Sequence, residues 1–392
     1  MNGMTDRERF LRIMQFKDAD RIPYWENLGF WPETLDRWRS EGLPEGIDLK
    51  EYYGILYRGS QEAYFELLNF FGFDRREMLA IGSYRLPGLF YLGPVPMFRR
   101  RVLEETAQYR IIVDELGIKK KESRIAKSQY MPQFLEYPVR NEEDLDQMKR
   151  RFDPNSPRRY PENWREIMKT YSNRDYPVGV EVYGFFGQPR EMLGLPRLLT
   201  WYFKYPQLVH DILDFWLEFT IRALKKPLSE VQVDYAIIWE DMSYRHGPMI
   251  SPKLFEEFLL PRYRRLTNFF RSFGINIIMV DSDGNCELLN PLWLEGGVTC
   301  VYPNERQAGM NPKTLREKYG EKLALIGGID KRVLASSPKA IEKELYAILP
   351  YLISTRGYIP SVDHVVPADV SLGNYLYYWK TVRKITNEVT RR

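Results

Sequence analysis

The sequence predicts an α/β fold built on a parallel sheet, and three observations lead to it. Six segments in the C-terminal two thirds of the chain are apolar and show little alternation, as strands covered on both faces do. Each runs directly into a polar cluster, and the stretches between them are long enough for a helix. Such a sheet is either open or closed into a barrel, and its ligands bind at the carboxyl ends of the strands. The six predicted strands are residues 178–183, 234–239, 275–280, 298–302, 323–327 and 357–362.

The N-terminal part of the chain predicts a helical extension that leads into the sheet. Thr5 and Glu8 have the spacing of a capping box, and the apolar residues that follow predict a first helix ending near residue 17. Residues 21–26 are expected to be extended and to enter the sheet as its first strand, because Pro23 disfavours a helix. A further helix over 61–74 and a short strand over 77–82 complete this part.

Between about residues 90 and 160 the pattern changes. Residues 101–117 alternate and turn at Gly117, and a charged run follows, which indicates an antiparallel excursion from the main sheet. A proline-bearing passage over 152–161 predicts a long loop. Because the chain has neither a fixed-period repeat nor a low-complexity tract, we treat residues 1–392 as a single domain.

Composition excludes several classes of protein. The 57 basic and 53 acidic side chains give a net charge of +4, which is too balanced to indicate a nucleic-acid partner. The two cysteines form no motif and indicate a reducing compartment. No apolar run is long enough to span a membrane, and the polar N-terminus does not resemble a signal peptide, so we expect a cytoplasmic protein that binds no membrane.

Two carboxylates and a histidine form the sharpest candidate site. Asp281, Asp283 and His364 each follow an apolar strand, and strand ends that converge on one mouth bring such residues together. Two carboxylates and an imidazole can hold a divalent metal and leave positions open for substrate. Alternatively, Asp281 caps the following turn and the pair Asp283–Gly284 is ordinary turn chemistry.

Other strand ends supply further candidates. Glu240 could be a catalytic base or a fourth metal ligand, together with Asp281 and His364 as catalytic residues. The expected substrate-binding residues are Tyr183, Trp239, Tyr244 and Asp330. The glycine-rich segment at 327–331, which holds Asp330, lacks the spacing of a nucleotide-binding motif and fits a plain tight turn equally well.

Three segments, in this order and at this spacing, resemble the uroporphyrinogen decarboxylase superfamily. They are DSDGN at 281–285, ALIGGIDK at 324–331 and GYIPSVDH at 357–364. The superfamily contains the haem-pathway decarboxylase and methyltransferases that use corrinoid or thiol carriers. The resemblance implies a (β/α)8 TIM barrel with an N-terminal helical extension and an antiparallel excursion near 90–160, and a homodimer.

The decarboxylase branch of this superfamily binds its many-carboxylate substrate with an arginine-rich segment after the first strand. Here that stretch is WENLGF at 25–30, so the basic clamp is missing. The decarboxylase's substrate-binding aspartate has no clear counterpart either, although His364 matches that branch's late histidine.

The zinc methyltransferase branch has a histidine and a cysteine at the positions of Asp281 and Asp283, and a second cysteine at the position of His364. Hard oxygen donors therefore replace soft thiolates, which favours Lewis-acid chemistry with Zn²⁺, Mn²⁺ or Fe²⁺. The leading hypothesis is a metal-dependent methyltransferase that moves a methyl group from a small substrate to a corrinoid carrier on a partner protein. The alternatives are a metal-free decarboxylase of a porphyrinogen-like or smaller carboxylate substrate, and a binding protein without catalysis.

Overall fold

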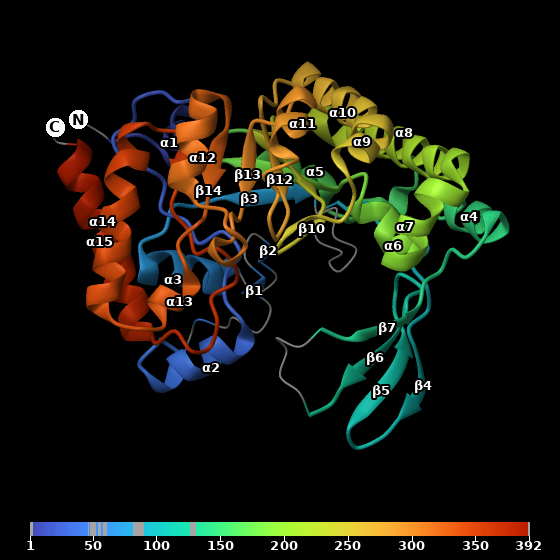
Figure 1. The fold of residues 1–392 in the computed structure, drawn as a ribbon, viewed down its shortest axis with the longest axis horizontal. Coiled ribbons are helices and arrows are strands. Elements are labelled where there is room, and N and C mark those ends of the chain that lie inside the picture. The colour runs from blue at the N-terminus through green and yellow to red at the C-terminus, as the bar shows by residue number, and fades with distance from the viewer. Residues whose placement is uncertain are drawn as a thin grey trace.

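A parallel sheet of seven strands forms the centre of the protein, and it curls around its own axis with helices outside (Figure 1). In the computed structural model the described residues are 3–45, 47, 52–53, 56–57, 61–80, 90–125 and 131–390. The strand order is β15-β14-β13-β12-β9-β8-β3, and every neighbouring pair is parallel. The strands are β3 (Glu77–Ala80), β8 (Val178–Tyr183), β9 (Tyr235–Trp239), β12 (Ile277–Asp281), β13 (Cys300–Tyr302), β14 (Ala324–Ile326) and β15 (Tyr358–Ile359).

All six strands predicted in the C-terminal two thirds are present, because apolar residues line both faces of each. Residues of one face fill the interior of the curl, and those of the other face pack against helices such as α8, whose Trp216 donates to the Tyr183 carbonyl at 2.8 Å. The helices are α1 (Asp6–Met14), α2 (Pro32–Ser40), α3 (Gln61–Phe71), α4 (Glu142–Lys149), α5 (Trp164–Thr170), α6 (Gly187–Leu193), α7 (Leu195–Lys204), α8 (Pro206–Glu230), α9 (Pro252–Leu254), α10 (Leu260–Ser272), α11 (Asn290–Glu295), α12 (Pro312–Tyr319), α13 (Lys331–Leu334), α14 (Pro338–Ser354) and α15 (Leu372–Thr390).

The predicted helix boundaries agree with the capping chemistry. Thr5 and Glu8 form the expected capping box at the start of α1. Ser251 caps α9, which continues through a π-helical turn into α10. The helix predicted over 61–74 ends earlier, at Phe71, because Gly72 takes a left-handed conformation with φ of 64°. Part of the strand predicted over 77–82 lies outside the described residues.

The segment expected to enter as the first strand is extended but is not a strand of the sheet. On one side, the Tyr24 carbonyl of this segment accepts a hydrogen bond from the Asp74 amide at 3.0 Å. On the other side, the amide of Asn27, just after the segment, donates to the Ser361 hydroxyl at 2.8 Å. Pro23 lacks an amide hydrogen, which interrupts a regular ladder. The sheet thus curls as a TIM barrel does, with seven regular strands among the described residues instead of the expected eight.

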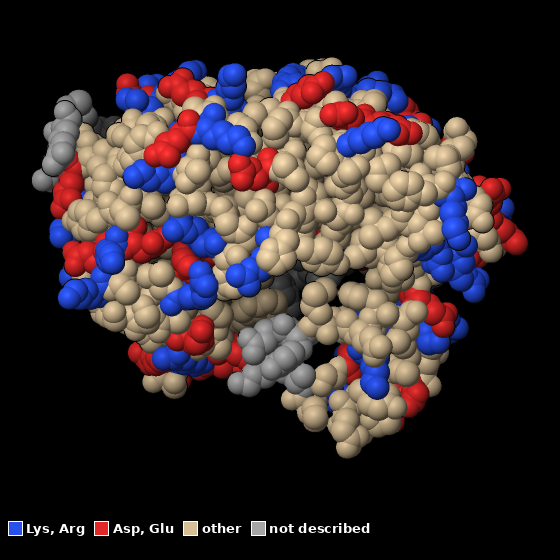
Figure 2. Space-filling model, in the orientation of Figure 1, with Lys and Arg blue, Asp and Glu red and all other residues tan. Residues whose placement is uncertain are grey.

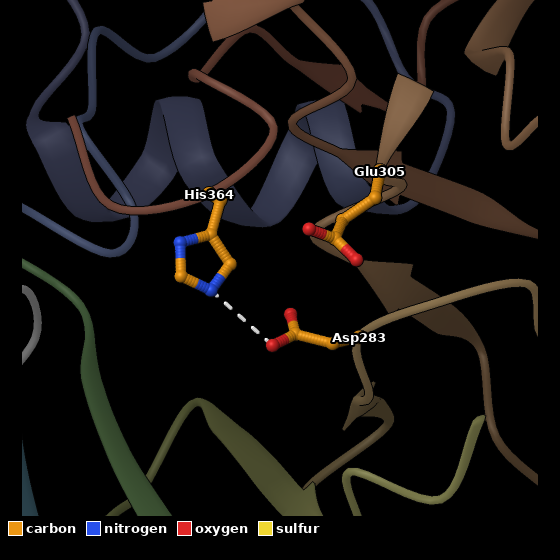
Figure 3. A group of neighbouring side chains, drawn as sticks. All are labelled: Asp283, Glu305 and His364. Carbon is orange, nitrogen blue, oxygen red and sulfur yellow. Dashed lines mark hydrogen bonds and ion pairs between the residues drawn. The ribbon is translucent and has the colours of Figure 1, made fainter. Parts of the chain in front are cut away.

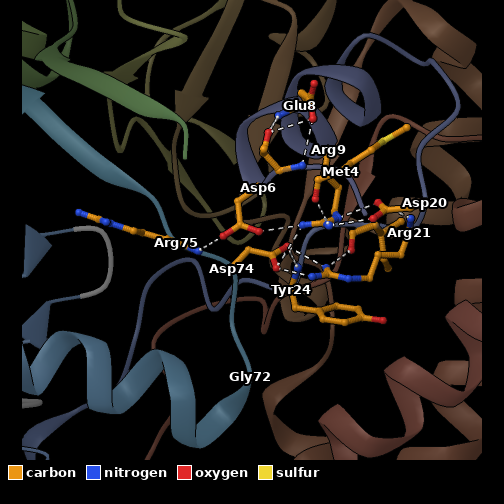
Figure 4. A network of polar contacts seen from close by, with 12 residues as sticks. Met4, Asp6, Glu8, Arg9, Asp20, Arg21, Tyr24, Gly72, Asp74 and Arg75 are labelled. Carbon is orange, nitrogen blue, oxygen red and sulfur yellow. Dashed lines mark hydrogen bonds and ion pairs between the residues drawn. The ribbon is translucent and has the colours of Figure 1, made fainter. Parts of the chain in front are cut away.

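A network of ion pairs holds α1 to the extended segment (Figure 4). Arg9, only 5% exposed, donates to Asp6 and Asp20 at 2.8 Å each and lies 3.5 Å from Asp74. Asp74 also accepts two hydrogen bonds from the Arg21 guanidinium and a third from the Tyr24 amide, at 3.1 Å. Because each buried charge has a partner, the network fixes α1 at the amino-terminal end of the sheet.

The excursion predicted between 90 and 160 is a separate antiparallel sheet of four strands. Its strands are β4 (Arg101–Glu105), β5 (Tyr109–Val113), β6 (Lys119–Ser123) and β7 (Gln133–Glu136), paired in that order. The sheet projects from the body of the molecule, and the surface is hollowed between the two (Figures 1 and 2). Lys, Arg, Asp and Glu are interspersed over the face seen in Figure 2.

Two short hairpins complete the strands, β1 (Tyr52–Tyr53) with β2 (Leu56–Tyr57) and β10 (Ser243–Tyr244) with β11 (Gly247–Pro248). The second hairpin follows β9 directly and lies at the carboxyl end of the curled sheet. Among the described residues, none of the helices has both the length and the apolar character needed to cross a bilayer.

Candidate metal centre

Three side chains from three strand ends meet at the carboxyl end of the sheet (Figure 3). Asp283 follows β12, Glu305 follows β13 and His364 follows β15. One donor atom from each lies within 4.8 Å of the other two, and all three side chains are partly exposed. We call Asp283, Glu305 and His364 the outer site. Two carboxylate oxygens and an imidazole nitrogen at this spacing can hold a divalent cation.

The imidazole of His364 is paired with a carboxylate within the outer site. Its Nε2 lies 3.2 Å from Oδ2 of Asp283. Burial lowers the pKa of His364, but the hydrogen bond and negative charge of Asp283 outweigh it, so the pKa is raised. The Lys331 ammonium, 3.4 Å from Glu305, acts in the same direction as burial and lowers this pKa in part.

Backbone geometry after β12 and β13 positions the two carboxylates. Gly284 has φ of 77°, and a Cβ there would lie 2.6 Å from the Ser243 carbonyl oxygen, so only glycine fits. Its amide donates to Glu305 at 2.9 Å. Asn304 has φ of 62°, and its side-chain amide donates to the carbonyls of Val301 and Ile326, at 3.0 and 2.9 Å.

Asp363 locks the loops around the outer site together. It has no exposed surface and accepts hydrogen bonds from the amides of Arg306, at 2.9 Å, and Lys331, at 3.0 Å. The carboxylate next to His364 thus ties the loops after β13 and β14 to the loop after β15. This places the neighbouring His364 against the loops that carry Glu305.

Asp281, the last residue of β12, is not among the three donors of the outer site. Burial raises its pKa well above the usual range, and the charges of Asp283, Glu181 and Asp241 add to that effect. A hydrogen bond with Tyr302 acts in the opposite direction. The structure therefore brings together two of the three predicted ligands, Asp283 and His364, and supplies Glu305 beside them.

Two of the expected substrate-binding aromatic residues share one row with Asp281 across the sheet. The register pairs Tyr183 with Trp239, Trp239 with Asp281, and Asp281 with Tyr302. We call these four residues the inner row. The rings of Tyr183 and Trp239 are 4.6 Å apart, whereas Tyr244, on the hairpin, is 59% exposed and does not belong to the row.

Glu181 lies one layer below the inner row, on β8. Residues two apart on a strand face the same side, so Glu181 faces the same side as Gly179. A Cβ added to Gly179 would meet the ring of Tyr235, so that ring lies on this side of the sheet too. That ring packs against Phe10 of α1 and Trp25 of the extended segment. Burial raises the pKa of Glu181 to about 7.

Glu240 occupies the position of a buried structural brace. It is 0% exposed and accepts hydrogen bonds from the amides of Phe185, Phe186 and Gly187, at 2.7 to 2.9 Å, and from the Tyr263 hydroxyl at 2.5 Å. These amides precede and begin α6, where a carboxylate is stabilised by the helix dipole. With its oxygens fully used, Glu240 differs from the catalytic base expected from sequence.

Asp330 likewise serves the fold. It is the N-cap of α13, accepting the Arg332 amide at 2.9 Å, and it pairs with the Arg332 guanidinium at 2.6 Å. Burial raises its pKa, but the hydrogen bonds from Arg332 outweigh burial and lower it. The tight-turn interpretation of this segment fits these contacts, and the role of Asp330 toward substrate stays a prediction.

Sequence reasoning did not assign two of the acidic residues around the mouth. Glu305 stands among the polar residues after the strand at 298–302, and that strand-end position was its only signal. Glu181 is the one charged residue within the apolar strand VGVEVY, which could have marked it as facing the interior.

The class of fold is an α/β sheet that curls as in TIM barrels, with carboxylates at its strand ends. A sequence model described as uroporphyrinogen decarboxylase matches residues 112–385, which is more than half of the chain. The chain therefore belongs to the uroporphyrinogen decarboxylase family.

Two solved structures illustrate what the chain resembles. A methyltransferase from Methanosarcina mazei has a TM-score of 0.62 at 15% identity, over 97% of this chain and 99% of the other. A B12-independent methionine synthase from Shewanella sp. W3-18-1 has a TM-score of 0.41 at 10% identity, over 95% and 98% of the two chains. At such identities the first shows a shared fold, and the second carries no further argument. No curated protein sequence matches.

Proposed function

We propose that this protein is a metal-dependent methyltransferase that moves a methyl group from a small substrate to a corrinoid carrier on a partner protein. The observation that carries the proposal is the convergence of Asp283, Glu305 and His364 from three separate strand ends to within 4.8 Å. The methyltransferase named among the structures with this fold supports the same direction.

The donor set fits a divalent metal of borderline character. Two carboxylate oxygens and one imidazole nitrogen suit Zn²⁺ first, and also Mn²⁺ or Fe²⁺, and the partly exposed site leaves room for a substrate ligand. When bound, such an ion supplies Lewis-acid polarisation of an oxygen of the substrate. The absence of thiolates argues against activation of a thiol acceptor.

The chain's own residues hold the donors in place and tune them. Asp283 fixes the ring orientation of His364 through the 3.2 Å contact with Nε2. The Gly284 amide holds one oxygen of Glu305, and the Lys331 ammonium lies 3.4 Å from the other. Because one of these supports is a backbone amide and the others are side chains of neighbouring loops, the donors are held before any metal binds.

We place the corrinoid carrier over the mouth, next to the hollow between the body and the four-stranded sheet in Figure 2. A carrier must bring its cofactor to the substrate methyl group, and the carboxyl ends of the strands are where that group would lie. The projecting sheet offers a second surface beside this approach.

The second candidate is a metal-free decarboxylase. The observation that favours it is the pair of His364 and Asp283, since an imidazole with a raised pKa can serve as a proton donor. The missing basic segment at 25–30 then requires a substrate with fewer carboxylates than uroporphyrinogen.

The first test is metal content. Wild type, His364→Ala and Asp330→Asn are purified without added metal, dialysed against a weak chelator and measured by elemental analysis. We expect about one equivalent of a transition metal in wild type and in Asp330→Asn, whose carboxylate caps α13, and a loss in His364→Ala because one of three donors is gone.

Methyl transfer is then measured with a panel of methylated ethers and amines. The readout is the change in absorption of reduced corrinoid when it is methylated. A wild type that stays metal-free when zinc or manganese is supplied contradicts the proposal. Carbon dioxide release from a carboxylate substrate by that metal-free protein would favour the decarboxylase.

A further inference from the structure

The interior of the sheet next to the outer site combines aromatic rings with carboxylates. The inner row of Tyr183, Trp239, Asp281 and Tyr302 spans four neighbouring strands, and Glu181 lies one layer below it. The negative charge of Glu181 acts on both Asp281 and Tyr302, which are two and three strands away. Contact across that many strands is made through the concave interior, because helices cover the other face.

Glu181 has no partner among the residues that the structure describes. It is 7% exposed, and it has no hydrogen bond or ion pair with any residue that the structure describes. Other buried carboxylates of this protein are heavily bonded, as Glu240 and Asp363 are. The oxygens of Glu181 are not among the buried side-chain atoms that lack a hydrogen bond, so they open to the interior of the sheet, where the donor of a bound ligand can reach them.

The positive charges nearest to the inner row are already committed. Arg190 pairs with Asp241 at 3.0 Å and lies 4.9 Å from the Trp239 ring centroid. Arg76, whose charge reaches Tyr302, donates to Asn27 at 2.9 Å and to the Glu26 carbonyl at 2.7 Å. Among the described residues, no cationic side chain pairs with Glu181 or Asp281.

A second metal ion does not fit this place. Within the described parts of the chain, the outer site is the one group of acidic, histidine or cysteine residues whose donors lie within 4.8 Å of one another. Glu181, Asp281 and Asp241 are therefore spaced too widely for a single small ion. Aromatic rings beside carboxylates are instead the usual surroundings of an organic ammonium group, which is attracted to ring faces and to diffuse negative charge.

We propose that the inner row and Glu181 bind a cationic nitrogen, so that the substrate is a small ammonium compound whose oxygen-bearing end faces the outer site. The inference rests on the proposed function for the position of the substrate, and it adds the substrate's chemical class. Glu181 and Asp281 supply carboxylates, whose ionised forms the bound cation stabilises, and Tyr183, Trp239 and Tyr302 supply the rings.

The test compares two probes that differ only in charge. Choline and 3,3-dimethylbutan-1-ol have the same shape, with a quaternary nitrogen in the first where the second has carbon. Calorimetric titration of each into the purified full chain, metal-loaded and chelator-treated, should show choline binding at least tenfold tighter than the neutral alcohol. Glu181→Gln should weaken choline binding tenfold or more and leave the alcohol unchanged.

Glu26→Gln is the matched control, because Glu26 is an equally buried carboxylate but has four hydrogen-bond donors and lies outside the inner row. It should bind choline as wild type does. Asp281→Asn provides a second variant if Glu181→Gln does not give the wild-type circular dichroism spectrum. Equal affinity for the two probes, or choline binding unaffected by both variants, would overturn the inference.

The two proposals fail separately. If metal-loaded protein binds choline and the alcohol equally well, the proposal of a metal site stands and the proposal of an ammonium substrate fails. If the protein binds no metal but still prefers choline, and Glu181→Gln abolishes that preference, the proposal of an ammonium site stands and the proposal of a metal site fails.

Discussion

At the scale of single residues, position along the strand end separates ligands from supports. Asp281 and Asp283 are two residues apart and both are partly exposed, yet Asp283 lies beside His364 whereas Asp281 is paired in register with Tyr302. Glu305 has no sequence motif, but its strand neighbours β12 and it reaches the same point. The donor set is thus a property of three loops, and no single segment contains it.

This difference predicts unequal effects of two conservative substitutions. Glu305→Gln keeps an oxygen that can accept from the Gly284 amide but removes the charge, so metal affinity should fall by at least about 100-fold, beyond the effect of losing an outer-shell partner. Asp281→Asn should change it by less than about 10-fold, the lower end of that outer-shell range. Competition with a chromogenic chelator measures both. A larger loss in Asp281→Asn than in Glu305→Gln would restore Asp281 as the ligand.

At the scale of elements, the loops at the mouth are supported by close packing. Gly184 follows β8, and a Cβ there would lie 2.1 Å from the carboxyl carbon of Glu240. Glu240 in turn binds the amides that begin α6. The glycine therefore allows a buried carboxylate to reach a helix start from the next strand.

Gly184→Ala should displace Glu240 and destabilise the protein by about 1–3 kcal/mol, as overpacking does. Urea unfolding, followed by far-ultraviolet circular dichroism, gives the change. Gly373→Ala is the control, since that glycine lies in α15 with nothing within 4 Å of its Cβ position. It should stabilise the protein slightly, by up to about 1 kcal/mol. Equal midpoints for the two variants would show that Glu240 tolerates displacement.

At the scale of the whole molecule, a buried carboxylate joins the two ends of the chain. Glu26, 2% exposed, accepts from the Asn27 amide, from Ser361 and Val362 next to β15, and from the Tyr375 hydroxyl on α15. Burial raises its pKa from 4.5 to about 7, against the effect of these hydrogen bonds. The closure of the curled sheet thus contains a titratable group.

The contribution of Glu26 to the stability of the protein should therefore fall as pH rises. A carboxyl group with a raised pKa contributes stability that is complete below pH 4.5 and is lost as pH passes about 7. At 1.36 kcal/mol per pKa unit, the contribution of Glu26 is at most about 3 kcal/mol. Wild type should lose that much more unfolding free energy than Glu26→Gln between pH 5 and pH 8, measured by urea unfolding.

The exposed Glu142→Gln is the control and should follow wild type. Glu181 has the same raised pKa of about 7, and the comparison of wild type with Glu26→Gln removes its effect because both proteins contain it. Parallel stability curves for these two proteins would contradict the assignment.

The sequence by itself determined the class of fold, the family and the end of the sheet where the site lies. Buried parallel strands have apolar residues on both faces and polar residues where they stop, and both features are local, so the strands from Val178 onward could be predicted. The capping residues Thr5 and Ser251 were predictable for the same reason, since a cap bonds within its own turn.

Only the tertiary structure decided which polar residues face the mouth. Asp283, Glu305 and His364 are brought together by strand order and by the loops that Asp363 and Gly284 hold, over separations that no local pattern records. Glu240 and Asp330 had the same strand-end signal, but hydrogen bonds to α6 and α13 direct their oxygens into the fold. Glu181 is proposed as a binding residue because no residue that the structure describes bonds it, and only packing in three dimensions reveals such a group.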